Sequence, residues 1–189
     1  MAQTNIPQLE PSAKVYKKIP VLDLGPYIAG HPGALEEIGT QVRYIQETIG
    51  FWAVVNHGVS WQILEEVYEQ LQRFFALPDE VKLQYRINEL SVGYVPPKST
   101  KYISSVINEN TKKDLNETLI TALDRPADHP FIMAGTRFVG PNQWPDELKR
   151  FRETIIAYQQ EILTLGRKLL PIYAVALELP PEYFDEYFT

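Results

Sequence analysis

Apolar residues recur at helical spacing in two stretches of the first half of the chain. In the first stretch they are separated by 4, 4, 3 and 4 residues, at Ala34, Ile38, Val42, Ile45 and Ile49. This spacing predicts one face of a helix, and Gly50 is suited to the C-terminal end of that helix. A second helix is predicted after Ser60, a favourable capping residue. Its predicted apolar face comprises Trp61, Leu64, Tyr68, Leu71 and Phe75.

Short apolar runs beside these helices predict strands. Residues 19–24 form such a run, which ends at a predicted turn beginning with Gly25. The aromatic and β-branched run 51–55 predicts a buried strand, and we expect both helices to pack on it with Trp52 in the core. Two further strands are predicted, over Tyr102–Ile107 and within Leu115–Leu123.

The second half of the chain alternates between irregular and helical patterns. A new helix is predicted at Asp79, and residues 124–145, with four prolines and two glycines, predict a long irregular connection. From Asp146 to about Leu179 the spacing is helical, and Pro171 is predicted to kink or break this helix. The predicted helix carries an apolar stripe of Tyr158, Ile162, Leu165, Leu169 and Tyr173. The predicted fold class is α+β, with a flexible N-terminal arm over residues 1–18 and one domain over residues 19–189.

Composition narrows the classes of protein that the sequence can represent. The chain has 24 acidic and 18 basic residues, a net charge of −6 and no basic cluster, which argues against nucleic acid or a membrane surface as a partner. The absence of cysteine excludes disulfides, thiolate metal sites and a cysteine nucleophile. No apolar run is long enough for a membrane span and no secretory leader is visible, so a cytoplasmic location is expected.

The three histidines do not form a local metal motif. His31, His57 and His129 each lack a carboxylate or second histidine at ligand spacing. A site assembled from all three across the fold is the open alternative, whereas His57 is predicted to shape a turn. The Gly-x-x-x-x-Gly spacing of residues 25–30 is not interpreted as a phosphate loop, because His31-Pro32 stands where Lys-Ser or Lys-Thr is needed.

Seven segments of the chain resemble, in the same order, the N-terminal part of the non-haem iron, 2-oxoglutarate-dependent dioxygenases of the isopenicillin N synthase type. The most specific are Gly50-Phe51-Trp52 followed by Asn56-His57-Gly58, and Asn142-Gln143-Trp144-Pro145. The matching segments are residues 19–24, 50–59, 74–82, 93–94, 114–117, 140–145 and 177–184. The resemblance implies structural roles for Asn56, His57, Gly58 and Trp144, and makes Tyr94 and Tyr102 candidates for the substrate mouth.

The resemblance covers only the helical N-terminal half of that family. Family members hold iron with His-x-Asp and a distant histidine, and hold 2-oxoglutarate with Arg-x-Ser, on a C-terminal jelly roll. This chain contains neither motif, and such a jelly roll needs roughly another 100 residues. We therefore expect the jelly roll to be absent, with no catalytic, cofactor-binding or metal-binding residue in this chain. Fe(II) and 2-oxoglutarate are expected only in the complete enzyme.

The sequence leaves two main hypotheses for function, and an unrelated small-molecule binding domain is a more distant third. In the first, the chain is the N-terminal structural part of a dioxygenase that oxidises a small molecule, and its partner is the missing jelly-roll half. In the second, the chain is a free-standing, non-catalytic interaction module derived from that family, and another protein covers the same face. In the first case the isolated chain is expected to be inactive and to expose apolar surface.

Overall fold

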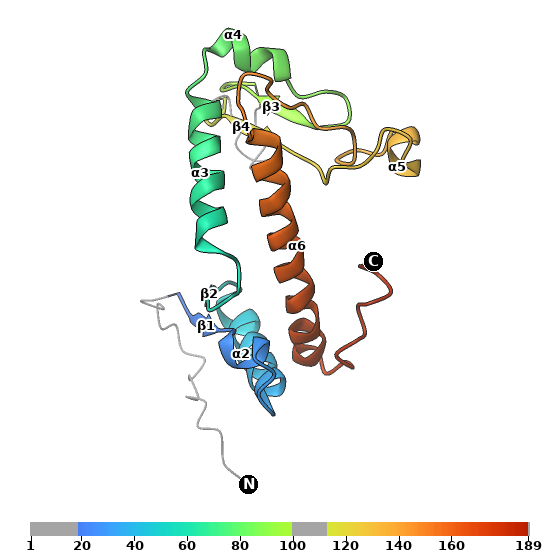
Figure 1. Ribbon diagram of the computed structural model, residues 1–189. Helices are drawn as coiled ribbons and strands as arrows, with labels where there is room; N and C mark the ends of the chain where they lie inside the picture. The colour runs from blue at the N-terminus through green and yellow to red at the C-terminus, as the bar shows by residue number, and fades with distance from the viewer. Residues whose placement is uncertain (1–18, 100–112, 189) are drawn as a thin grey trace, which may run out of the picture. The chain divides into compact units, whose positions relative to one another are not determined.

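The computed structural model describes residues 19–99 and 113–188. The predicted arm 1–18, the predicted strand Tyr102–Ile107 and the candidate Tyr102 lie outside the described residues. The described chain forms two compact units (Figure 1). The first unit contains the residues up to Gly58 and those from Leu165 onward, and the second unit is Val59–Thr164.

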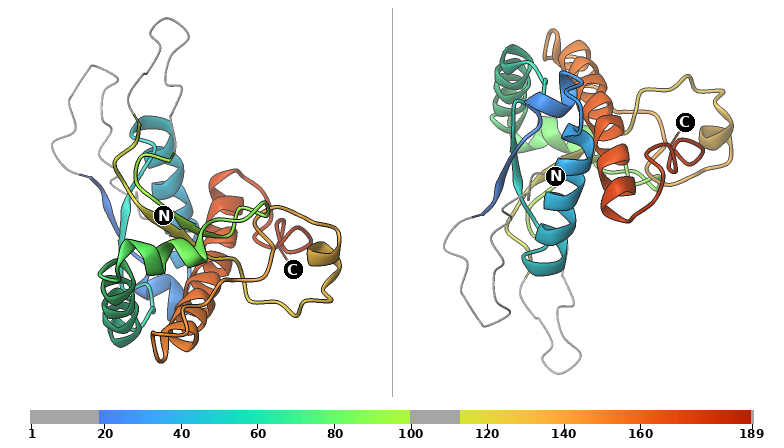
Figure 2. Two further views of the ribbon diagram at one scale, coloured as in Figure 1. Left: turned by 90° about the horizontal axis from the view of Figure 1, so that it is seen from above. Right: turned by 90° about the horizontal axis from the view of Figure 1, so that it is seen from below.

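The first unit is built on a parallel pair of short strands. Strand β1 (Val21–Asp23) pairs with β2 (Ala53–Val55), with Leu22 opposite Val54. The chain crosses between them through the short helix α1 (Gly25–Ile28) and the longer α2 (Ala34–Thr48). The two strands run side by side in both views of Figure 2. The turn predicted at Gly25 is thus a one-turn helix, which accommodates Pro26 in its first turn, where a backbone N–H is not required.

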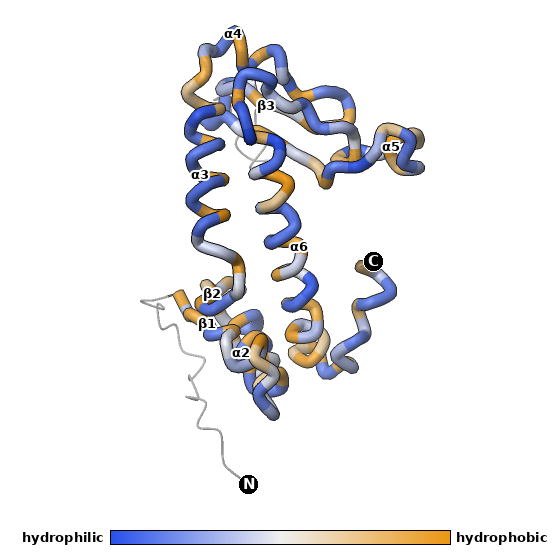
Figure 3. Tube along the Cα trace, viewed as in Figure 1, coloured by the Kyte–Doolittle hydropathy of each residue, from blue (hydrophilic) through white to orange (hydrophobic). Residues whose placement is uncertain are grey.

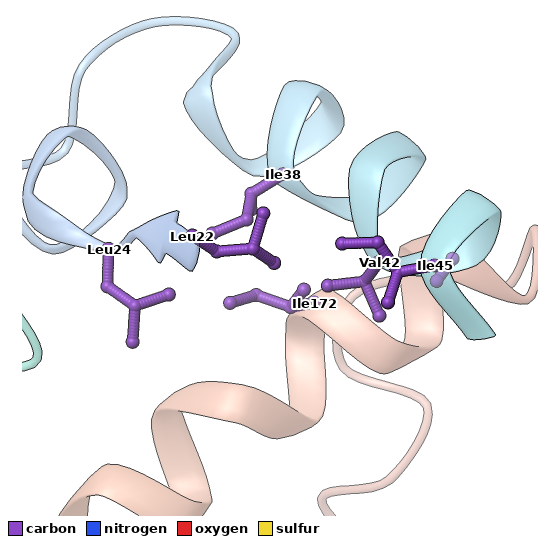
Figure 4. Packing of buried hydrophobic residues seen from close by; sticks show 7 residues of the cluster. Leu22, Leu24, Ile38, Val42, Ile45 and Ile172 are labelled. Carbon is purple, nitrogen blue, oxygen red and sulfur yellow. The ribbon is translucent and has the colours of Figure 1, made fainter. Parts of the chain in front are cut away.

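Helix α2 and the C-terminal turns of α6 (Phe151–Ala176) cover one face of this strand pair. The predicted spacing of α2 is confirmed, since Ile38, Val42 and Ile45 are all buried. Figure 4 shows the aliphatic side chains of this core directed toward one another. Its buried members are Leu22, Leu24, Ile38, Val42, Ile45, Ile172 and Ala176.

The strand predicted within residues 51–55 is present as β2, but the prediction that it is buried was wrong. The side chains of Ala53 and Val55 are exposed, Phe51 is 57% exposed, and Trp52 is only partly buried. The reason is that only one face of the β1–β2 pair meets α2 and α6 within the first unit, so alternate residues of β2 point away from the core.

Helix α6 continues through Pro171 to Ala176, so the predicted break was wrong. Proline removes one backbone donor from a helix and usually disturbs the preceding turn. In this helix the Tyr27 hydroxyl donates a hydrogen bond of 3.0 Å to the backbone carbonyl of Lys168. This bond and the buried Ile172 fix the turns on either side of the proline to the core of the first unit.

The second unit joins helices to an antiparallel strand pair. It begins with α3 (Trp61–Phe75), α4 (Asp79–Lys82) and the 3₁₀ turn η1 (Leu83–Tyr85). Strand β3 (Gly93–Val95) then pairs with β4 (Thr118–Ile120), with Tyr94 opposite Leu119. Helix α5 (Pro130–Met133) lies within the long connection that precedes α6. The bounds of α3, the helix start at Asp79 and the strand within Leu115–Leu123 are confirmed.

The core of the second unit is largely aromatic. Phe74 is fully buried and its ring centroid lies 5.8 Å from that of Tyr94 and 5.7 Å from that of Phe151. The buried members of this cluster are Val67, Phe74, Tyr94, Leu148, Phe151 and Ile155. The cluster includes no residue of the strand 51–55, and the expected packing of α3 on that strand stays a prediction.

The predicted buried face of α3 was right only in part, since Leu71 and Phe75 pack against this cluster. Trp61 and Tyr68 are 75% and 65% exposed, whereas Val67 and Phe74 are buried. In Figure 3 a few apolar positions interrupt the mainly hydrophilic trace of this helix, and spacing alone does not decide which of them are buried. The aromatic partners Tyr94 and Phe151 select the face that contains Phe74.

Within the described residues no helix is both long enough and apolar enough to cross a membrane.

Candidate functional site

A buried ionic cluster lies beside strand β3 in the second unit. Tyr94 on β3 is 1% exposed, and its hydroxyl donates a 2.5 Å hydrogen bond to Oε2 of Glu117, just before β4. The same oxygen accepts a 2.8 Å hydrogen bond from Nζ of Lys82 at the end of α4. One carboxylate oxygen therefore ties together three segments that are distant in the sequence.

Lys82 is 4% exposed and has a complete set of partners. Besides Glu117, its ammonium group pairs with Asp79 at 3.1 Å and donates to the backbone carbonyl of Phe75 at 3.3 Å. It also lies 5.4 Å from the centroid of the Tyr94 ring, a cation–π distance. A buried charge is costly unless it is paired and hydrogen-bonded, and both conditions hold for Lys82.

The pKa values of this cluster favour its charged form. Burial alone would lower the pKa of Lys82, but its hydrogen bonds to Glu117 and Asp79 outweigh burial and raise that pKa well above its ordinary value. Burial alone would raise the pKa of Glu117, and the hydrogen bonds from Lys82 and Tyr94 instead hold it below its ordinary value. Burial and the bond to Glu117 raise the pKa of Tyr94. The cluster thus holds its charges fixed, which suits structural support and does not suit proton transfer at neutral pH.

The Asn142-Gln143-Trp144-Pro145 segment, which follows both strands in the sequence, holds the residues next to them by hydrogen bonds. The Asn142 side chain binds both backbone groups of Ala122, accepting from its N–H at 2.7 Å and donating to its carbonyl at 2.9 Å. Nε2 of Gln143 donates to the backbone carbonyls of Arg86 at 3.0 Å and Val92 at 2.9 Å. Two neighbouring amides therefore hold the chain on either side of the β3–β4 pair.

Trp144 and Gly93 complete this support. Trp144 is partly buried, and its ring packs edge-on against that of Phe151, with the two centroids 6.3 Å apart. Gly93 has a φ of +126°, and a β-carbon there would lie 2.6 Å from the backbone oxygen of Tyr85. Only glycine combines that backbone angle with so close an approach. The structural role inferred for Trp144 stays a prediction, and this packing supports it.

The Asn56-His57-Gly58 segment follows β2 in the first unit. Asn56 has a φ of +52°, and its Nδ2 donates a 2.8 Å hydrogen bond to Oδ1 of Asp23 at the end of β1. The same oxygen accepts from the backbone N–H of Gly25 at 2.8 Å. These two bonds lower the pKa of Asp23, and the bond from Asn56 has the larger effect. His57 is partly buried in this turn, and Gly58 has a φ of +82°. The geometry is that of a turn in which side chains join the ends of both strands.

Of the two predicted substrate-mouth residues, the structure describes Tyr94 alone. Tyr94 is in the core of the second unit, and Tyr102 is outside the described part of the chain. The role of Tyr94 at a substrate mouth stays a prediction. Lys82 and Glu117 are in segments that resemble the dioxygenases, but their pairing was missed, because a contact across 35 residues leaves no local pattern.

A resident iron site does not fit the part of the chain that the structure describes. No group of three or more His, Cys, Asp or Glu side chains there is arranged to hold a metal ion. Of the histidines, His129 instead caps α5, its Nδ1 accepting a 3.3 Å hydrogen bond from the N–H of Phe131. No step of a reaction is therefore assigned to these residues.

Comparison with known proteins identifies the family. A family model described as non-haem dioxygenase in morphine synthesis, N-terminal, matches residues 19–147. The chain belongs to this family. Kihadalactone A synthase of Citrus sinensis is 32% identical over 171 residues, which is 89% of this chain and 49% of that protein. Azadirone synthase of Melia azedarach is 37% identical over 138 residues, or 71% of this chain and 40% of that protein.

Solved structures of the family share the fold of this chain. A 2OG-Fe(II) oxygenase family protein of Caulobacter crescentus has a TM-score of 0.71 and 21% identity, covering 88% of this chain and 51% of that one. The rice dioxygenase for auxin oxidation has a TM-score of 0.58 and 27% identity, covering 86% of this chain and 46% of that one. The resemblance found in the sequence is confirmed, and the chain spans about half the length of the curated relatives it matches.

Proposed function

We propose that this chain is the N-terminal supporting part of a 2-oxoglutarate/Fe(II)-dependent dioxygenase, and that the complete protein oxidises a small molecule. The family match and the coverage of about half of each relative support this proposal. A 2-oxoglutarate-dependent dioxygenase of Monascus ruber is 33% identical over 174 residues and has a similar proportion of its length covered, 51%. Iron and 2-oxoglutarate are then bound by residues outside the described part of the chain.

The outward face of the β1–β2 pair is the observation that carries the proposal. Strand residues alternate between two faces, so Val21 and Val55 lie on the face opposite the core, and two large apolar residues just before the strands are exposed as well. Their exposed fractions are 55% for Ile19, 59% for Val21, 57% for Phe51 and 43% for Val55. Within the described residues the pair has no third strand, so both of its edges are open.

An apolar sheet face with open edges is an aggregation hazard unless another part of the protein covers it. The match covers about half of each relative, so each relative has a further half outside the matched residues. We assign the cover of the β1–β2 face to that half, the jelly roll expected from the sequence. The Tyr94–Glu117–Lys82 cluster and the Asn142–Gln143 amides then serve as rigid support for the part of the fold that borders it.

Two experiments test this proposal. Sequencing the transcript beyond the codon for Thr189 is expected to show an open frame that encodes His-x-Asp and Arg-x-Ser. The 189-residue chain is expected to bind a hydrophobic dye and to form oligomers in light scattering coupled to gel filtration, and Val21→Glu is expected to reduce both. Leu115→Glu is the matched control, since Leu115 is 73% exposed in the second unit.

The opposite results favour the free-standing module. A stop codon directly after Thr189, together with a monomer that binds no dye, would show that the chain needs no further half. An equal effect of Val21→Glu and Leu115→Glu would show that the β1–β2 face has no special role.

A further inference from the structure

The end of helix α6 has a backbone conformation that favours glycine, but a glutamate adopts it. The helix ends at Ala176, and Glu178 has a φ of +62°, in the left-handed region. The backbone N–H of Glu178 donates to the carbonyl of Val175 at 3.0 Å, and that of Leu179 donates to the carbonyl of Ala174 at 2.9 Å. These two bonds form a Schellman motif, in which the left-handed residue is usually glycine. A residue with a β-carbon is less stable there unless another contact compensates.

Arg43 of α2 provides such a contact. Its Nη1 donates to Oε1 of Glu178, and its Nε donates to Oε1 of Glu47 at 3.0 Å. The side chains of Arg43 and Glu178 are 46% and 77% exposed, so the pair adds little to global stability. The free-energy cost of a left-handed residue is also small, so a contact of this strength can decide the conformation of Glu178.

Close packing of α2 on α6 places Arg43 beside the end of α6 (Figure 4). Gly39, one turn before Arg43, is buried, and a β-carbon there would lie 2.6 Å from Cγ1 of Val175. Glycine inside a helix is unfavourable by itself, and this close approach explains its presence. On the other side of Arg43, Nε2 of Gln46 donates a 3.3 Å hydrogen bond to the Tyr173 hydroxyl. Contacts on both sides therefore hold Arg43 near the last turn of α6.

The direction set at Glu178 continues into the residues that follow. Pro180 and Pro181 come directly after Leu179, and proline restricts its own backbone and that of the residue before it. Beyond them is an aromatic segment, residues 183–188, in which neighbouring ring centroids are 5.1–6.3 Å apart. Its rings are those of Tyr183, Phe184, Tyr187 and Phe188. A change of backbone angle at Glu178 would therefore redirect the aromatic segment.

We propose that Arg43 is an electrostatic latch on the end of α6, which keeps Glu178 in the left-handed conformation and so fixes the direction of residues 179–188. When the ion pair breaks, Glu178 can leave the left-handed region and the aromatic segment takes other directions. Salt weakens the latch, because exposed charges are screened. The proposal concerns α2 and the end of α6, which belong to the same unit, and it is independent of the dioxygenase assignment.

Hydrogen exchange resolved by residue in the 189-residue chain tests the latch. The N–H of Leu179 is the reporter, because its bond to the carbonyl of Ala174 requires a left-handed Glu178. Relative to the intrinsic rate, Arg43→Gln should accelerate exchange of this N–H by about twofold to fivefold, the effect of losing an exposed ion pair. Arg167→Gln is the matched control, since it removes a positive charge from an exposed position on α6. Equal rates in the two variants would overturn the proposal.

Glu178→Gly separates a latch from an ion pair that has no effect on the backbone. Glycine adopts the left-handed conformation without a partner, so the N–H of Leu179 should stay protected in this variant, and adding Arg43→Gln should not change its exchange. High salt should accelerate exchange in the unaltered chain and not in the Glu178→Gly chain. If Arg43→Gln accelerated exchange equally in both backgrounds, the ion pair would not act through the conformation of residue 178, and the proposal would be refuted.

Spin-label distances test whether the latch fixes the direction of the aromatic segment. The chain has no cysteine, so Thr40→Cys on α2 and Asp185→Cys in the aromatic segment, both at exposed positions, introduce two unique labelling sites. The distribution of distances between the labels should be narrow. Arg43→Gln should broaden it, whereas Arg167→Gln should not. A distribution that Arg43→Gln leaves unchanged would show that the ion pair does not fix this direction.

Discussion

The two units are stabilised by different kinds of core. The first unit has an aliphatic core in which α2 contributes residues at regular helical spacing. The second unit has an aromatic core around Phe74, with the buried ammonium group of Lys82 beside the ring of Tyr94. Aliphatic packing follows from periodicity along one helix, whereas the second core depends on groups that meet only when distant segments are in place. The second unit should therefore be the more sensitive to single substitutions and to pH.

The largest expected effect is that of Phe74→Ala. Phe74 is fully buried and packs against the rings of Phe75, Tyr85, Tyr94 and Phe151. Removing the ring should lower the free energy of unfolding of the second unit by about 3–5 kcal/mol. Chemical denaturation with hydrogen exchange resolved by residue measures this loss in each unit. Phe131→Ala, at a side chain that is 56% exposed, is the control. A loss below about 1 kcal/mol would mean that the aromatic core does not determine stability.

A smaller effect is expected for Lys82→Met. Removing one partner of a fully buried ion pair costs about 3–5 kcal/mol, but the Glu117 side chain is 30% exposed, so we expect about 2 kcal/mol. Adding Glu117→Gln should recover part of the loss, because no unpaired charge then remains. Lys113→Met tests the removal of an exposed lysine. If Lys82→Met proved neutral in denaturation, the cluster would not support β3 and β4.

The pH dependence should also differ between the units. The pKa of Glu117 and that of Asp124 are lower in the folded chain than their ordinary values of 4.5 and 3.8. A lowered pKa contributes stability that is present above the unfolded pKa and is lost as pH falls through the folded pKa. The second unit should therefore lose stability progressively below about pH 5. In the first unit the one lowered carboxyl among the described residues is that of Asp23, which is solvent-exposed.

Hydrogen exchange at pH 7, 5 and 4 measures this difference. Glu117→Gln should flatten the pH dependence of the second unit and leave that of the first unchanged. A larger loss of stability in the first unit than in the second as pH falls would contradict this prediction.

The smallest effect is expected for Trp52→Ala in the first unit. The sequence predicted a buried core aromatic with a cost of about 3–5 kcal/mol. Trp52 is only partly buried against the aliphatic core, so we expect about 1–2 kcal/mol. Trp61→Ala, at a side chain that is 75% exposed, should have almost no effect on the free energy of unfolding. A loss of about 3 kcal/mol or more, measured by denaturation, would show that Trp52 is a core residue after all.

The helices could be predicted from the sequence, and the faces they bury could be predicted only in part. The bounds of α2 and α3 follow from spacing and from Pro78 after α3. In α2 one side alone is apolar, so its buried face was predicted too. In α3 both Trp61 and Phe74 are on apolar stripes, and only the contacts of Phe74 with Tyr94 and Phe151 distinguish them.

Strand β3 and the ionic cluster could not be predicted, for a related reason. Strand β3 has only three residues. Its Gly93 is needed because the Gln143 amide and the Tyr85 carbonyl approach too closely for a β-carbon, and Gln143 is distant in the sequence. The bonds of Glu117 and of Asn142 join segments 20 or more residues apart. The motif around Asn142 was nevertheless found, because its resemblance to the dioxygenases carried information that spacing did not.

The discontinuous make-up of the first unit sets an order for its assembly on the ribosome. The residues up to Gly58 emerge first, but their core lacks Ile172 and Ala176 until residues 59–164 have been synthesised. At about 5–20 residues per second that interval is on the order of 5–20 s. During this time Leu22, Val42 and Ile45 have no closing partner, whereas the second unit can gather Phe74, Tyr94 and Phe151 as soon as α6 begins to emerge. Helix α6 thus completes the second unit with its first turns and the first unit with its last, and a nascent chain paused before Leu165 would offer its unfinished first core to chaperones.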